Sequence, residues 1–403
     1  MLKNIKIQNF YSINKEQKIS FEILPKDVLN DSSRLIAPDG QKGINLVSAI
    51  IGANASGKTN ILKSFVFLFW FIENGYSQMK EDDSTGVEAF KTNIKEPTNI
   101  EIEFYNQEKQ YQYRITLDSK RVISEYFWEK RRRKFSQIFE YDTRDKERWN
   151  LKTKIKINET DAKRFRERLN VSLLSSLIET GYLSHIRFFK DGVSNVTNIG
   201  TYAQNPVKGF LDTSEKLFKN EDLKNKVFPF TQNLDFGISG FDFKEATLVR
   251  KDKPSEEKKA HLIECLHNIG KNSFRLPLIE ESNGTQNSIA MLANIFTVLE
   301  KGSIAIFDEI DAHLHPAIVR KIISLFENKL TNPKNAQLLF STQQHLLLND
   351  RTKTQIFITE KNNQSLETEI YRLDEIEGIR NDENYFHKYI TGAYGGTPEI
   401  KWL

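Results

Sequence analysis

The sequence predicts an α/β fold, and three stretches of the chain carry this prediction. Residues 44–70 combine an apolar run, a glycine-rich turn and a longer apolar run, which is the pattern of a strand, a loop and a helix. Residues 99–128 contain runs in which apolar and polar residues alternate, as in an antiparallel sheet with one face in water. Residues 304–309 are an apolar run that ends in two carboxylates.

The glycine-rich turn from Gly52 to Thr59 matches G-x-x-x-x-G-K-[ST] at every required position. We expect a buried strand at Ile44–Ile51 and a helix from Asn60 to Trp70, the context that this pattern needs. The glycines let backbone N–H groups and the helix N-terminus face phosphates. Lys58 would reach the β- and γ-phosphates, and the Thr59 hydroxyl would bind Mg²⁺. The predicted nucleotide-binding residues are Asn54, Ala55, Ser56, Gly57, Lys58, Thr59 and Asn60.

The composition narrows the class of protein. A chain of 403 residues is long enough for two or three domain-sized units. The charged fraction of 28% and a longest apolar run of only Phe65–Ile72 argue against a membrane protein. A single cysteine, Cys265, excludes a disulfide framework and a cysteine-based zinc site, and the N-terminus lacks the apolar core of a signal peptide. These features predict a cytoplasmic protein.

The rest of the chain follows in order. Residues 2–24 are expected to form a hairpin, and residues 25–43 a loop that leads to the phosphate-binding strand. Residues 74–98 are polar and are expected to be exposed. We predict an N-terminal lobe over residues 1–154, an inserted, mainly helical segment over 155–270, and a C-terminal lobe over 271–403.

The segment 130–168 is the most basic part of the chain, with Lys130–Lys134 followed by Lys163, Arg164, Arg166 and Arg168. One interpretation is a solvated hairpin tip and a solvated helix face. The other is a contact with the phosphate backbone of DNA or RNA, helped by the aromatic residues Phe135, Trp149 and Phe165. The net charge of +4 permits nucleic-acid binding without requiring it.

The strand at Ile304–Phe307 leads into Asp308 and Glu309. A carboxylate at the end of such a strand, beside a phosphate loop, can hold Mg²⁺, and we give this role to Asp308. Glu309 could orient or deprotonate the attacking water. A buried strand with an acidic cap is the alternative, and it explains one acidic residue better than a pair.

A second phosphate-binding device is predicted upstream of that strand. Ser282 is placed to cap an apolar helix that includes Ile289–Leu299, and Gly284 lies at its first turn. A helix N-terminus with a bare glycine and a hydroxyl suits an anion. One triphosphate cannot easily contact both the glycine-rich turn and the helix start at Ser282 of the same chain. We therefore expect a second subunit to complete the site.

These motifs carry a family resemblance over most of the chain. The chain resembles ATP-binding-cassette (ABC) class ATPases of the SMC and RecF kind. Within them it is similar to stand-alone bacterial ATPases linked to abortive infection and phage defence, such as the ATPase subunit of the PARIS system. The matching stretches are Ile7–Ser12 (I-x-N-F-x-S), Gly52–Asn60 (Walker A), Glu281–Thr285 (signature), Phe307–Pro316 (Walker B, D-loop and L-H-P) and Tyr389–Pro398 (Y-x-x-G-x-Y-G-x-x-P).

The resemblance implies a two-lobed ABC-type P-loop head that forms a dimer or higher homo-oligomer around shared ATP. Ser282 and Gly284 would contact the γ-phosphate held by Lys58 of the other copy, and Asp311 would lie at the dimer seam. ATP binding would close the dimer and hydrolysis would open it. Turnover is expected to be slow, because the energy drives a conformational cycle.

Two positions depart from the family pattern. Gln343 stands where the family has a histidine that senses the γ-phosphate, and His345 follows two residues later. Either residue could be the sensor, or hydrolysis could be weak; a glutamine can orient a water. Tyr11 replaces a common arginine, and no Q-loop glutamine can be placed. His313 and His315 lack a third metal ligand nearby and are assigned to the D-loop extension.

Three functions remain open from the sequence. The first is an ATPase that acts as a sensor and scaffold in bacterial anti-phage defence. The chain leaves no room after the head for a nuclease domain, so we expect a separate toxin or nuclease effector. The second is a RecF-like DNA-repair ATPase that binds DNA through residues 130–168. The third is a module that binds ATP without hydrolysing it.

Overall fold

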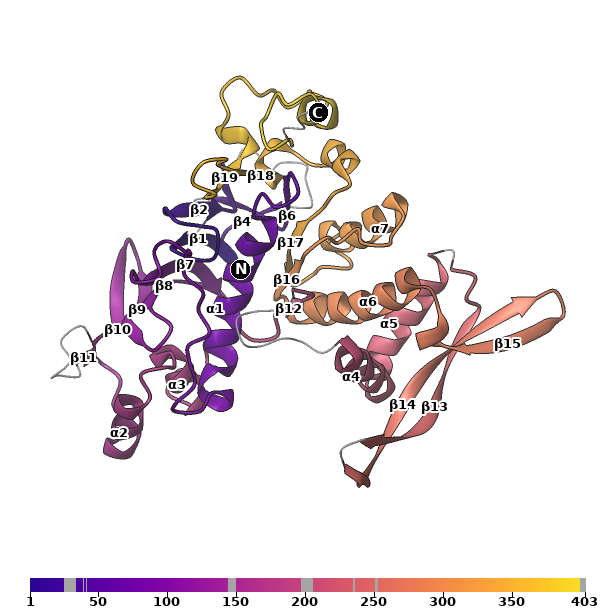
Figure 1. Ribbon diagram of the computed structural model, residues 1–403, viewed down its shortest axis with the longest axis horizontal. Helices are drawn as coiled ribbons and strands as arrows, with labels where there is room; N and C mark the ends of the chain where they lie inside the picture. Colours follow the sequence, from indigo (N-terminus) through magenta and orange to yellow (C-terminus); the bar gives the residue numbers. More distant parts are fainter. Residues whose placement is uncertain are drawn as a thin grey trace.

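The computed structural model describes residues 1–24, 34–38, 40, 42–143, 150–196, 206–234, 236–250 and 253–398. An antiparallel sheet with the strand order β11-β10-β9-β8-β7-β1-β2 forms one layer (Figure 1). Its strands are β1 (Leu2–Gln8), β2 (Gln17–Ser20), β7 (Thr98–Asn106), β8 (Lys109–Leu117), β9 (Val122–Arg131), β10 (Lys134–Asp142) and β11 (Asn150–Thr153). The predicted hairpin over residues 2–24 and the predicted antiparallel sheet over 99–128 are confirmed. Most of the loop expected at 25–43 lies outside the described residues.

A second, mostly parallel sheet has the order β12-β16-β17-β6-β18-β19. Only the β18–β19 pair is antiparallel. The strands are β6 (Val47–Gly52), β12 (Val193–Ser194), β16 (Ile304–Phe307), β17 (Gln337–Ser341), β18 (Ile356–Lys361) and β19 (Thr368–Arg372). Because β6, β16 and β17 run in parallel, the residues after their carboxyl ends gather at one edge of the sheet.

Helix α1 (Lys58–Gln78) packs between the two sheets (Figure 1). Its apolar side chains share one core with strands of the antiparallel sheet and with one face of the parallel sheet. The opposite face of the parallel sheet is covered by α4 (Pro206–Lys219), α5 (Glu221–Gln232), α6 (Asn283–Lys301) and α7 (Pro316–Glu327). The α/β class and the antiparallel β-subdomain are therefore confirmed.

The predicted strand at Ile44–Ile51 is divided in the structure. Residues Gly43–Asn45 form β5, which pairs with β3 (Glu22–Ile23) and β4 (Arg34–Ile36), and the chain enters the parallel sheet only at Val47. The Asn45 side chain donates a hydrogen bond to the Thr354 carbonyl oxygen at 2.6 Å. A continuous apolar run does not reveal that its two halves pair with different sheets.

The segment 155–270 differs from the mainly helical insertion that we expected. It contains α2 (Glu159–Glu167), α3 (Leu173–Glu179), α4 and α5, but also β12, β13 (Gly240–Arg250) and β14 (Lys253–Ile269). The last two pair with each other and, through β14, with β15 (Asn272–Pro277) in a long sheet that projects from the side of α4–α6 (Figure 1). Phe241 and Phe243 are half-buried and alternate with exposed polar residues, which is a strand pattern. The division of the chain into lobes stays a prediction.

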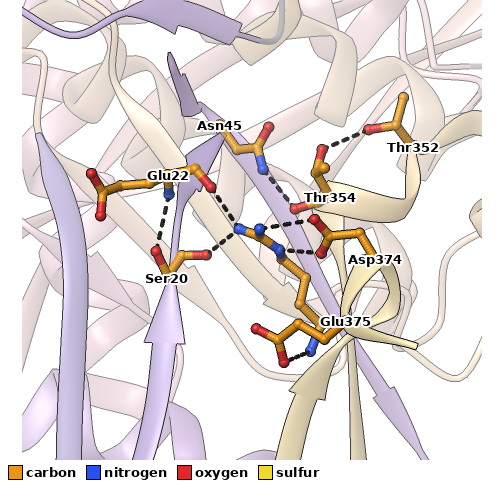
Figure 2. A network of polar contacts seen from close by, with 8 residues as sticks. Ser20, Glu22, Asn45, Thr352, Thr354, Asp374 and Glu375 are labelled. Atoms are coloured by element: carbon orange, nitrogen blue, oxygen red, sulfur yellow. Dashed lines mark hydrogen bonds and ion pairs between the residues drawn. The ribbon is translucent and has the colours of Figure 1, made fainter. Parts of the chain in front are cut away.

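The N- and C-terminal parts of the chain are joined by a polar network around Arg372 at the end of β19 (Figure 2). Its guanidinium donates to the carbonyl oxygens of Ser20 at 2.8 Å and Glu22 at 2.7 Å and forms an ion pair with Asp374. The remaining elements are the 3₁₀ turns η2 (Leu278–Glu280), η3 (His345–Asp350), η4 (Lys353–Gln355) and η5 (Leu373–Glu375), and helix α8 (Tyr385–Ile390). In the described residues, no helix is long and apolar enough to cross a membrane.

Candidate functional site

The phosphate loop connects β6 to α1. Gly57 has a φ of 108° at the helix N-terminus, and a Cβ at this position would overlap the Thr368 side chain. Glycine is therefore required there. No described side chain caps the helix, so its first N–H groups are available to an anion.

Lys58 lies over this loop. Its Nζ donates to the carbonyl oxygens of Gly52 at 2.8 Å and Ala53 at 3.0 Å. Burial lowers the pKa of Lys58, and three nearby carboxylates oppose that shift: Asp308, Glu309 and Asp311. The ammonium group is therefore held among acceptors, where phosphate oxygens could replace the loop carbonyls.

The two predicted magnesium ligands meet in the structure. The Thr59 hydroxyl donates to Asp308 Oδ2 at 2.7 Å, and the Ser341 hydroxyl donates to Asp308 Oδ1 at 2.5 Å. A hydroxyl and a carboxylate are hard oxygen ligands that suit Mg²⁺, which keeps several waters and needs few protein ligands. The described residues contain no cluster of three His, Cys, Asp or Glu side chains that could hold a metal.

Asn195 is a site residue that the sequence reasoning missed. Its Oδ1 accepts from the Asp308 backbone N–H at 2.7 Å, and its Nδ2 donates to the Asp308 carbonyl oxygen at 2.8 Å. Strand β12 places it there, because Val193 and Ser194 pair in parallel with Ala305 and Ile306. A two-residue strand gives almost no periodicity in the sequence, so only the pairing reveals it.

The residues after Asp308 follow a tight turn. Glu309 has a φ of 46°, its backbone N–H donates to the Ser341 hydroxyl at 2.8 Å, and its side chain is exposed. The Asp311 carboxylate accepts from the backbone N–H of Gln343 at 3.3 Å. The Glu309 carboxylate is open to solvent next to Asp308 in the chain, and its role as general base stays a prediction.

The two candidates for the γ-phosphate sensor, Gln343 and His345, contact different parts of the structure. Gln343 Nε2 donates to Asn54 Oδ1 in the phosphate loop at 2.9 Å. His345 instead packs against the Tyr389 ring, with ring centroids 4.7 Å apart, and its buried Nε2 has no hydrogen-bond partner in the described structure. Burial, and next the charge of Lys58, lower the pKa of His345, so its neutral form is favoured. Which of the two residues senses phosphate stays a prediction.

The signature residues adjoin the D-loop of the same chain. Ser282 caps α6, accepting from the Thr285 backbone N–H at 3.1 Å. A Cβ on Gly284 would lie 2.7 Å from the His313 carbonyl oxygen, so the close approach requires glycine. His315 in turn caps α7, accepting from the Ala317 N–H at 3.2 Å, a structural role. Among the described residues, no hydrogen bond joins residues 281–285 to residues 52–60.

The C-terminal tail also reaches the phosphate loop. The Gly396 carbonyl oxygen accepts from the Ala53 N–H at 2.7 Å and from the Tyr389 hydroxyl at 2.8 Å. Between the tail, the phosphate loop and the β18–β19 turn lies a cavity of ≈ 650 Å³. Asn60, the last of the predicted nucleotide-binding residues, connects the phosphate loop to the turn between β1 and β2. Its side-chain amide donates a hydrogen bond to the Ser12 hydroxyl at 2.7 Å.

The basic segment is only partly available to a nucleic acid. Phe165 is buried in the core, so it cannot stack on a base, whereas Phe135 is 38% exposed. Trp149 lies outside the described residues. Arg168 donates to the carbonyl oxygen of Tyr76 at 2.7 Å and is structural. Arg132 and Arg133, at the tip of the β9–β10 hairpin, are exposed.

Comparison with solved structures finds SMC head domains over nearly the whole chain. The SMC head domain from Thermotoga maritima is 14% identical, covers 92% of this chain and 98% of its own, and has a TM-score of 0.43. The Smc head domain with a coiled coil and joint from Pyrococcus yayanosii is 13% identical, covers 97% and 99%, and also has a TM-score of 0.43. Comparison with curated proteins finds no match.

Comparison with family profiles gives one match. Residues 47–349 match the family described as "AAA domain, putative AbiEii toxin, Type IV TA system". The matched region contains the phosphate loop, Asp308, Glu309, the signature residues and Gln343, and it spans more than half of the chain. The chain therefore belongs to this AbiEii-type family of AAA-domain ATPases.

Proposed function

We propose that the protein binds ATP and Mg²⁺ and hydrolyses ATP slowly at a site shared between two copies of the chain. The hydrogen bond between Thr59 and Asp308 carries this proposal. At the carboxyl edge of the parallel sheet, it brings the phosphate loop and the acidic end of β16, which lie 249 positions apart in the sequence, within reach of one ligand.

Each residue then has a defined role. Lys58 exchanges its loop carbonyls for the β- and γ-phosphate oxygens, while the N–H groups of residues 54–60 surround the phosphates. Thr59 and Asp308 would hold Mg²⁺, which neutralises phosphate charge when bound. Glu309 orients or deprotonates the water, and Gln343 or His345 senses the γ-phosphate.

The shared site rests on the position of the signature. Ser282 and Gly284 adjoin the D-loop and make no hydrogen bond to the phosphate loop of the same chain in the described structure. We infer that they contact the γ-phosphate held by a second copy, with Asp311 at the seam. The resulting assembly is a homodimer or a higher homo-oligomer, which ATP binding closes and ATP hydrolysis opens.

The first experiment measures phosphate release by the wild type and by Glu309→Gln. Hydrolysis should fall by about 10²–10⁴-fold when the general base is removed, with ATP affinity retained. Glu108→Gln, an exposed substitution in the β7–β8 turn, is the matched control. Equal rates for the wild type and Glu309→Gln would instead support a module that binds ATP without hydrolysing it.

We further propose that this ATPase acts in the cytoplasm as a sensor and scaffold in bacterial anti-phage defence and controls a separate toxin or nuclease effector. The family description, which names a putative AbiEii toxin of a type IV TA system, supports a role in such a system; the sensor role and the separate effector are our proposal. Deletion of the gene should sensitise the host to phage, and affinity purification from its own operon should recover the effector. Unchanged phage sensitivity together with no recovered partner would contradict it.

A RecF-like repair function is the alternative, supported by the exposed Arg132 and Arg133. Filter binding with duplex DNA or RNA over a salt titration tests it. Phosphate contacts give a log–log slope of about −0.9 for each phosphate neutralised on duplex DNA. A steep slope that flattens in an Arg132→Ala and Arg133→Ala double variant would favour repair, and no binding at low salt would exclude it.

A further inference from the structure

A second cavity lies at the end of the parallel sheet where β16 and β17 begin. Its volume is ≈ 530 Å³, within the range of about 300–1,000 Å³ typical of small-molecule sites. The lining residues that carry the argument are Arg187, Phe188, Lys190, Lys301 and Lys334. None of them belongs to the nucleotide site.

The charges around this cavity are unbalanced. Lys301 pairs with Asp191, and the one other lining carboxylate, that of Glu300, lies 3.9 Å from Lys226. Among the described residues, Arg187 and Lys334 have no ion pair.

Two further charged groups, Glu73 and Lys216, lie close to the lining residues. The positive charge of Lys190 stabilises the carboxylate of the half-buried Glu73, although burial still raises the pKa of Glu73. Lys216 adds a cation near Lys301, and burial lowers its pKa. The cations therefore outnumber the carboxylates, at a cost in mutual repulsion that an anion would relieve.

We propose that this cavity binds a phosphate-bearing small molecule. Arg187 and Lys190 line the cavity from one segment, and Lys301 and Lys334 line it from two others. An arginine fork with point-charge lysines is the usual recognition set for phosphate. The Phe188 ring, which stacks on Phe104 with centroids 4.3 Å apart, lines the same cavity and can contact an organic moiety. Two sources share this chemistry: inorganic pyrophosphate and a nucleotide.

The site is separate from the phosphate loop. Lys301 is the last residue of α6 and Ile304 begins β16, whereas Asp308 follows the carboxyl end of that strand. A strand of four residues is about 13 Å long, so a ligand here does not occupy the space of ATP. The proposal does not depend on hydrolysis or on dimer formation.

Calorimetry of Lys58→Ala, in which the phosphate loop is disabled, tests the proposal with two probes. Sodium pyrophosphate and ADP are titrated separately. Tighter binding of ADP would identify a nucleotide site, and equal affinities would identify recognition of phosphate alone. Each outcome supports the cavity only if charge reversal weakens binding.

The reversal is Arg187→Glu with Lys190→Glu in the Lys58→Ala background. We expect at least a tenfold loss of affinity, because attraction becomes repulsion. The matched control, Lys163→Glu with Arg164→Glu on α2, changes the net charge equally at exposed positions. Arg187→Gln with Lys334→Gln is a milder pair in case the reversal impairs folding. Absence of binding to either probe, or equal loss in the reversal and the control, would overturn the proposal.

Discussion

At the scale of single residues, the polar side chains of the site are held in place by hydrogen bonds to one another and to the backbone. Lys58 rests on the carbonyl oxygens of its own loop, and Asp308 is fixed through its side chain by Thr59 and Ser341 and through its backbone by Asn195. Such prior positioning reduces the reorganisation needed when charge arrives. Two substitutions test separate parts of this arrangement.

Lys58→Ala should weaken ATP binding by about 10–100-fold, the effect of losing charge-assisted hydrogen bonds of about 1.5–3 kcal/mol. The fold should persist, because the hydrogen bonds that the Lys58 ammonium donates in the described structure go to carbonyl oxygens of its own loop. Calorimetry measures affinity and a thermal melt measures stability. Lys91→Ala, at an exposed position, is the control. Unchanged ATP affinity would refute the assignment of the phosphate loop.

Asn195→Ala should lower hydrolysis about tenfold, because the backbone of Asp308 loses two hydrogen bonds worth about 1 kcal/mol each. Asn195 acts through Asp308, so the Mg²⁺ concentration for half-maximal activity should rise as well. A merely structural role would leave the magnesium dependence unchanged. Asn195→Asp, which keeps the acceptor for the Asp308 N–H, should give an intermediate value.

At the scale of elements, β9 and α3 are joined by a buried carboxylate. Glu125 accepts hydrogen bonds from the backbone N–H groups of Leu173 and Leu174, both at 2.7 Å, and from the hydroxyls of Ser172 at 2.9 Å and Tyr113 at 3.0 Å. These bonds satisfy N–H groups at the start of the helix that would otherwise be buried without acceptors. Burial raises the pKa of Glu125 despite them.

Glu125→Ala should destabilise the N-terminal part of the chain by about 3 kcal/mol, the cost of leaving several buried donors without acceptors. Urea unfolding measures the change. Glu179→Ala, which removes an exposed carboxylate at the other end of α3, is the control and should change stability little. Equal stability of the two variants would contradict the capping role of Glu125.

Glu125 also predicts a pH dependence. Because its pKa is raised in the folded state, its contribution to stability is fully present below the unfolded pKa of about 4.3 and is lost as pH rises through the folded pKa. The stability of the wild type relative to Glu125→Gln should therefore fall from pH 4 to pH 8. Urea titrations at several pH values measure it. A relative stability that rises with pH would mean that the folded pKa is lowered instead.

At the scale of the whole molecule, the two faces of the parallel sheet pack against different elements. Helix α1 links the sheet to the antiparallel subdomain, and α6 brings the signature to the D-loop on the opposite face. The β13–β15 sheet projects beyond α4–α6 (Figure 1). In the proposed dimer, each signature would contact the phosphate loop of the other copy, since a two-fold interface repeats each contact.

Mixing Lys58→Ala with Ser282→Ala tests this pairing. Each variant alone should be nearly inactive, because both sites of its dimer carry the same defect. A mixed dimer holds one site with both native residues, so an equal mixture should recover about a quarter of the wild-type rate by counting sites in a two-fold dimer. Steady-state phosphate release measures it. No recovery, with mixed dimers shown by light scattering in the presence of ATP, would exclude a shared site.

The sequence by itself determined the parts of this protein that depend on local pattern. Short-range periodicity predicts the alternating strands β7 and β8. The phosphate loop follows from the left-handed backbone at Gly57, and the start of α6 follows from the side-chain cap that Ser282 provides. Short-range rules apply wherever a motif fits within one strand, loop or helix. The family match over residues 47–349 agrees with that reading.

Only the tertiary structure decided which distant segments meet. Contacts between segments distant in the sequence produce four features of the structure. They are the hydrogen bonds between Asn195 and Asp308, the division of one apolar run into β5 and β6, the β13–β15 sheet, and the cationic cavity around Arg187. A two-residue strand such as β12 carries almost no signal of its own, and its place is fixed by hydrogen bonds to β16. The burial of Phe165, which removes it from a nucleic-acid surface, was likewise decided by packing against a core that lies elsewhere in the sequence.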